Sequence, residues 1–86
     1  MKKITINKDW GGYHLPKKFC TMYNCAEDAY INRTDELLIS FIEDMPQFAE
    51  SLGIVEIPDE ASDWMIIDYD GIETVFFVID GKIKSA

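Results

Sequence analysis

The residues best suited to chemistry in this chain are three carboxylates around Gly71: Asp68, Asp70 and Glu73. Neighbouring carboxylates can exchange protons in hydrolysis, and carboxylate oxygens are ligands that calcium prefers. The ligand order of a complete calcium loop is missing, however, and two carboxylates at the solvent-facing rim of a strand pair are usually only hydrated. The sequence therefore predicts neither a catalytic pair nor a metal ion at this position.

Histidine and cysteine give the second set of candidates. His14 has no serine or cysteine at a spacing that indicates nucleophilic catalysis. Cys20 and Cys25 lie in a stretch whose apolar residues recur at helical spacing, roughly 16–29. Residues five apart on a helix point about 140° away from each other, which rules out a shared zinc ion or a disulfide. With no phosphate-binding loop motif either, we predict two free thiols, no cofactor and no enzyme.

Charge is distributed unevenly along the chain. Its net charge is −8, yet residues 1–34 carry six basic and three acidic side chains, whereas residues 35–86 carry two basic and thirteen acidic ones. So negative a C-terminal part repels phosphate groups and membrane surfaces and attracts basic protein surfaces. Direct nucleic-acid or membrane binding is thus disfavoured. The alternative, that the acids only keep a small domain soluble, stays open.

Length and composition predict a single domain that covers residues 1–86. Nearly half of the residues are apolar and eleven are aromatic, a content that disordered acidic segments lack. No apolar run approaches the roughly 18–20 residues needed to cross a bilayer. The first residues, MKKITIN, alternate in polarity and do not form an apolar signal core. We therefore expect a cytoplasmic protein.

Hydrophobic periodicity predicts an α+β fold. After the helix at roughly 16–29, a second helix near 34–51 carries one apolar stripe, and Pro46 should kink or break it near Asp44. Asp70-Gly71 is a standard hairpin signal. Alternating or β-branched stretches predict strands at residues 2–8, 53–58, 63–69 and 73–79. We expect an antiparallel three- to four-stranded sheet, packed on one face by the second helix, with the first as a shorter N-terminal helix.

A family of small proteins encoded by bacteriophages and prophages is similar to this chain in three stretches: INKDWGGYHL, NRTDELLISFIEDM and LGIVEIPDEASDWMIIDYDGIETV. Its members show an I-N-K-x-x-G-G-[FY]-x-L start, a central R-T-D-x-x-L-[IV] helix and an I-V-E-I-P-D…[DE]-Y-D-G-x-E ending. This chain departs from the family at its C-terminus, where VFFVIDGKIKSA replaces a basic tail with histidine and tryptophan. The resemblance implies a phage gene product that acts inside a bacterial cell, and it supplies no catalytic residues.

A small acidic phage protein without catalytic groups fits an inhibitor of a host defence protein, such as a CRISPR effector or a restriction enzyme. Its carboxylates can imitate nucleic-acid phosphates and be steered into a basic channel. One alternative is an accessory phage domain with a structural or regulatory role. Another is a binder of a nucleotide signal, which requires a basic pocket built from Lys2, Lys3, Lys8, Lys17, Lys18 and Arg33.

The predicted partner-binding residues are the acids of the Asp70-Gly71 hairpin and of the segment before it, with two aromatic anchors. This set is preferred over the acids of the second helix because a strand pair holds its side chains more rigidly. The expected partner is a basic surface of a host protein that handles nucleic acid. The predicted residues are Glu56, Asp59, Glu60, Asp63, Trp64, Asp68, Tyr69, Asp70 and Glu73.

Overall fold

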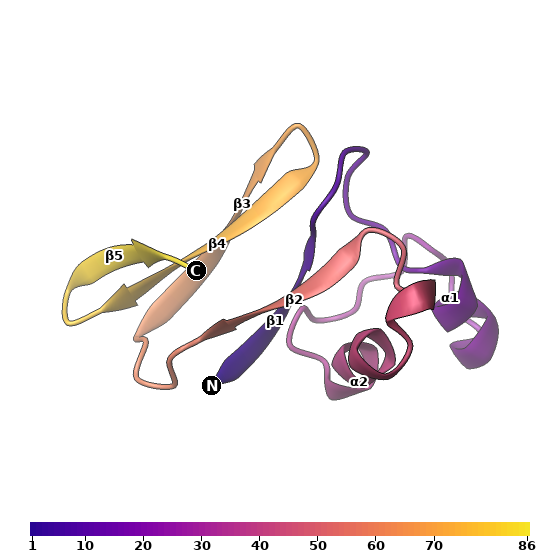
Figure 1. Ribbon diagram of the computed structural model, residues 1–86, viewed down its shortest axis with the longest axis horizontal. Coiled ribbons are helices and arrows are strands. Elements are labelled where there is room, and N and C mark those ends of the chain that lie inside the picture. Colours follow the sequence, from indigo (N-terminus) through magenta and orange to yellow (C-terminus); the bar gives the residue numbers. More distant parts are fainter.

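The chain folds into three layers (Figure 1). The computed structural model describes all 86 residues. The middle layer is a two-stranded antiparallel sheet of β1 (Lys2–Asn7) and β2 (Leu52–Ile57). One outer layer is a three-stranded antiparallel sheet in the order β3-β4-β5, and the other contains the helices. The predicted α+β class is therefore confirmed, with five strands in two sheets where one sheet of three or four was expected.

The helices are shorter than their apolar patterns suggested. Helix α1 spans Lys17–Tyr23 and stops because Asn24 takes a left-handed conformation with φ of 52°. Helix α2 spans Glu36–Asp44, capped by the Asp35 side chain. The predicted break at Pro46 is confirmed, since a separate 3₁₀ turn, η1 (Pro46–Phe48), follows α2.

The three strands of the outer sheet run one after another along the chain, joined by two tight turns. They are β3 (Asp63–Tyr69), β4 (Ile72–Ile79) and β5 (Lys82–Ser85). Both turns are Asp-Gly pairs in which both residues have positive φ, as a type I′ hairpin requires. The first hairpin was predicted from the sequence and the second was not, although Asp80-Gly81 gives the same signal as Asp70-Gly71.

Two apolar clusters hold the layers together, and the middle sheet contributes to both. Alternate residues of β2 point to opposite faces, so Leu52 faces the helices while Ile57 faces the outer sheet. The cluster beneath the helices contains Leu15, Phe19, Leu38, Phe41, Ile42, Ala49 and Leu52. The cluster between the sheets contains Ile4, Ile6, Ile57, Val75 and Phe77.

The sheets stay separate because the free edge of β1 is occupied by other groups. The backbone N–H of Thr5 donates to the carbonyl oxygen of Arg33 at 2.8 Å, and the N–H of Asn7 donates to the Glu73 carboxylate at 2.8 Å. Strand β4 packs beside β1 without forming a backbone ladder with it. The helices therefore pack on the two-stranded sheet, and not on one sheet of three or four strands as expected.

Candidate protein-interaction surface

The outer face of the three-stranded sheet is apolar and uncovered. Along β3, Trp64 and Ile66 point inward and are half-buried, whereas the intervening Met65 and Ile67 are 51% and 45% exposed. The helices lie on the far side of the molecule from this sheet (Figure 1). A groove of about 240 Å³ runs over this outer face, lined by Asp63 and seven apolar residues from all three strands. We call its outward-facing apolar residues the outer trough: Met65, Ile67, Phe76, Val78 and Ile83.

Five of the predicted binding acids are exposed along the edge strand β3, the loop that leads into it and the turn that follows it. They form two groups at opposite ends of the strand, because five residues of β-strand separate Asp63 from Asp68 by about 17 Å. Only Asp59 has a cationic partner, the N-terminal ammonium group at 3.1 Å. We call this set the acidic edge: Asp59, Glu60, Asp63, Asp68 and Asp70.

Glu73, placed on the rim by the sequence analysis, is instead buried between the sheets, with 5% of its side chain exposed. Its carboxylate accepts two hydrogen bonds from the Arg33 guanidinium, at 2.7 and 3.0 Å, and a third from the Asn7 backbone. The guanidinium in turn lies 3.5 Å from the centre of the Tyr13 ring. Burial raises the pKa of Tyr13, opposed by nearby Arg33. Glu73 is therefore a structural residue and not part of a binding surface.

Two glycine turns from distant parts of the chain touch beside this ion pair. A side chain on Gly71 would place its Cβ 2.5 Å from the backbone nitrogen of Gly12, so no larger residue fits there. The Asn7 side-chain amide donates to the carbonyl oxygens of Gly71 and Asp9. Three stretches that are far apart in the sequence, around Asn7, Arg33 and Gly71, thus meet here and hold the layers together.

The other predicted residues lie in different environments. Trp64 is half-buried against the apolar cluster between the sheets, so it is not an exposed anchor. Tyr69 is 76% exposed at the hairpin end of β3. Glu56 is exposed on β2, where it pairs across the ladder with Lys3, away from β3. Trp10, which the sequence analysis did not select, is 62% exposed beside the glycine turn.

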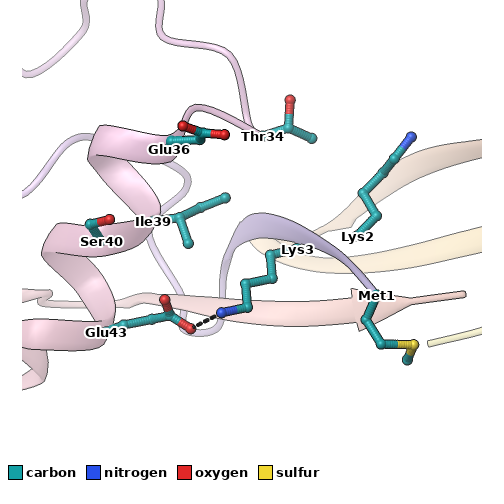
Figure 2. A pocket seen from close by; sticks show the side chains of 8 residues that line it. All are labelled: Met1, Lys2, Lys3, Thr34, Glu36, Ile39, Ser40 and Glu43. Atoms are coloured by element: carbon teal, nitrogen blue, oxygen red, sulfur yellow. Dashed lines mark hydrogen bonds and ion pairs between the residues drawn. The ribbon is translucent and has the colours of Figure 1, made fainter. Parts of the chain in front are cut away.

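The six basic residues required for a nucleotide pocket do not converge. A second pocket, of about 390 Å³, contains Lys2 and Lys3 together with Glu36 and Glu43. Figure 2 shows the Lys3 ammonium directed at the Glu43 carboxylate, a 2.6 Å ion pair. The hydrogen bond to Glu43 and the attraction of its charge raise the pKa of Lys3. This pocket therefore offers an anion little unopposed positive charge.

The cysteines lie closer together than the predicted long helix allowed. After Asn24 the chain reverses, and the N–H of Cys25 donates to the carbonyl oxygen of Cys20 at 3.2 Å. In this type of helix C-terminus, the side chains of the two residues joined by that backbone hydrogen bond, here Cys20 and Cys25, lie close together. Burial and a hydrogen bond to the Cys25 thiol raise the pKa of Cys20 to about 11. Both thiols are free, but the expectation that they point apart is wrong.

His14 makes a surface contact. Its Nε2 lies 3.1 Å from the carboxylate of Glu50, which also accepts a 2.6 Å hydrogen bond from the backbone of Lys17. That backbone bond, followed by the hydrogen bond with His14, lowers the pKa of Glu50. The arrangement secures the first turn of α1.

No group of three or more histidine, cysteine or acidic side chains is arranged to hold a metal ion, and no helix is long and apolar enough to cross a membrane. Comparison of the chain with protein-family models, with curated proteins and with solved structures found no match in any of the three.

Proposed function

We propose that this protein binds a basic surface of a host protein and inhibits it, without catalysing a reaction of its own. The observation that supports this proposal is the acidic edge, where four of five exposed carboxylates have no cationic partner within the chain. Unpaired carboxylates on one edge steer a basic partner toward it and set the orientation of the encounter.

The spacing of these carboxylates favours a partner that handles nucleic acid. The two ends of β3 present charge about 17 Å apart on a strand that the β4 ladder holds straight. Asp63 and Asp68 point to opposite faces of the strand, so the edge presents two separate clusters of carboxylates, which can occupy two basic sites of a phosphate-binding protein in place of phosphates. In the context that the resemblance implies, the protein is a phage product in the cytoplasm of a bacterial host, and its target is a CRISPR effector or a restriction enzyme.

Charge neutralisation at constant shape tests the proposal. In the edge variant, Glu60→Gln is combined with Asp63→Asn, Asp68→Asn and Asp70→Asn. Asparagine preserves the Asp68 oxygen that accepts from the Gly71 N–H at 2.9 Å, and it tolerates the positive φ of residue 70. A control variant removes the same charge from exposed acids elsewhere: Glu27→Gln, Asp28→Asn, Glu36→Gln and Asp44→Asn.

Binding is measured against purified restriction and CRISPR nucleases at two salt concentrations, together with inhibition of DNA cleavage. The parent and the control variant should bind and inhibit one of them, the edge variant should lose both effects, and binding should weaken as salt increases. Equal binding by the two variants would contradict the proposal and leave the acids a role in solubility. Binding to none of the nucleases would instead favour the accessory-domain alternative.

A further inference from the structure

The outer trough is a solvent-exposed apolar groove that the fold leaves uncovered beside the acidic edge. Ile83 is 73% exposed and Met65 is 51% exposed, on opposite sides of a floor formed by half-buried Phe76 and Val78. A contiguous apolar surface bordered by charged residues is characteristic of a site for another macromolecule.

The dimensions of the trough match those of an α-helix. Strands β3 and β5 lie on either side of β4, so two strand spacings of about 4.8 Å separate the walls by roughly 10 Å. A helix with its side chains is about 10–12 Å in diameter. Strand β5 pairs with Phe76–Ile79 only, so both walls are present over about 10 Å, roughly two helical turns, and Ile67 continues the β3 wall beyond them.

The charged residues around the outer trough indicate which kind of helix it can bind. The two lysines of β5 pair across the ladder with Ile79 and the buried Phe77, so they project from the inner face and not into the trough. The single charged residue that lines the trough is Asp63. The start of β3 and the end of β4 meet at that end of the sheet. Two further exposed acids without an ion pair, Glu60 and Asp80, belong to the same end, where Asp59 is paired with the N-terminal ammonium group.

We infer that the outer trough binds an amphipathic helix of a partner protein, with an apolar stripe against Met65, Phe76 and Ile83 and basic side chains over the Asp63 end. This inference rests on the proposed function, because it specifies the part of the basic host protein that is bound. The helix N-terminus lies toward the acids, since its partial positive charge is favourable there. A second copy of this chain is a poorer occupant because it brings another net charge of −8.

A synthetic peptide provides the direct test. The probe is a fluorescent, helix-forming peptide of about 18 residues with leucines along one stripe and lysines in its N-terminal third. Its charge-reversed counterpart carries glutamates in place of the lysines. Fluorescence anisotropy measures binding, circular dichroism measures induced helix, and sedimentation reports self-association. The basic peptide should bind and gain helix, and its counterpart should bind at least about tenfold more weakly.

Two variants locate the site. Ile67→Thr combined with Ile83→Thr removes apolar surface from the trough and keeps residues suited to strands. Leu37→Gln is the control, because Leu37 on α2 is 47% exposed and Ile67 is 45% exposed. The trough variant should weaken peptide binding at least about tenfold, while the control should match the parent.

The inference is overturned if the peptide does not bind, if the trough and control variants bind it equally, or if the trough variant abolishes only self-association. It is also overturned if the trough variant still binds the host nuclease that the edge variant has lost, and the proposed function then stands. Conversely, peptide binding at the trough with no nuclease bound supports this inference and contradicts the proposed function.

Discussion

Arg33 and Glu73, forty positions apart in the sequence, form a bidentate ion pair with nitrogen–oxygen distances of 2.7 and 3.0 Å at the junction of the three layers. Arg33 also supplies the carbonyl oxygen that pairs with β1, and Glu73 accepts from the next free N–H on the same strand. One ion pair thereby fixes the segment before α2, the middle sheet and the outer sheet relative to one another.

Removal of either charge should destabilise the protein, and Arg33→Ala more so, because it leaves the Glu73 carboxylate unpaired with 5% of its side chain exposed, whereas Arg33 is 24% exposed. We expect Arg33→Ala to reduce the free energy of unfolding by about 3–5 kcal/mol and Glu73→Ala to reduce it by less. The double variant should lose less than the sum of the two, since no unpaired charge remains. Urea denaturation of the four proteins measures the coupling. Additive losses would mean that the two side chains stabilise the fold independently.

The two Asp-Gly turns should respond differently to the same substitution. Gly71→Ala meets both an unfavourable positive φ and the backbone of Gly12 at 2.5 Å, whereas Gly81→Ala has positive φ but open space around it. Each variant should lose about 1 kcal/mol for the backbone conformation. Gly71→Ala should lose clearly more, and its thermal melting temperature should be the lower of the two. Equal melting temperatures would mean that the contact between the glycine turns relaxes freely.

Glu50 should stabilise the protein at neutral pH and cease to do so in acid. Its pKa is lowered in the folded state by the Lys17 backbone hydrogen bond first and by His14 second. The stabilisation is therefore complete above the unfolded pKa and disappears as pH falls through the folded pKa. At pH 7 the Glu50→Gln variant should have a lower melting temperature than the parent. At about pH 2 the two melting temperatures should be equal. Glu60→Gln, at an exposed position without an ion pair, is the control, and an equal decrease in its melting temperature would contradict this assignment.

Cys20 should resist alkylation in the folded protein. Because its pKa is raised to about 11 from a reference of 9.0, its thiolate fraction at pH 8 is roughly 100-fold below that of an ordinary thiol. Peptide mapping after timed iodoacetamide treatment, in buffer and in urea, gives the ratio of the two rates. A Cys20 rate in buffer close to the rate in urea would show that neither burial nor Cys25 protects the thiol.

Local signals predicted four of the five strands to within one residue at each end, missed β5, and predicted the ends of the helices poorly. Strand β3 coincides with the predicted residues 63–69, because side-chain alternation and the Asp70-Gly71 turn both act within a few residues. Helix α1 ends at Tyr23, where Asn24 adopts a left-handed conformation that glycine more commonly occupies. Apolar residues recur at helical spacing as far as residue 29, so the end of the helix at Tyr23 was not predicted.

The layer arrangement and the position of Glu73 depended on contacts between distant segments. Glu73, Val75 and Phe77 alternate onto one face of β4, and side-chain alternation in the predicted strand 73–79 would have placed Glu73 inward with the two apolar residues. Its pairing with Arg33 has no comparable local signal. The outer trough was also missed, because both faces of the hairpin are apolar in sequence and only the packing shows which one is covered.

The middle sheet also determines when the fold can form. Strand β1 pairs only with β2, so Lys2 meets Ile57 across fifty-four intervening residues, whereas β3, β4 and β5 pair with their immediate neighbours. Closing so long a loop is entropically costly and slow, while hairpins form within microseconds. During synthesis the first strand stays unpaired until residue Ile57 of β2 has left the ribosome. The strands β3, β4 and β5, which follow β2 in the chain, can then pair quickly and cover the other face of the middle sheet.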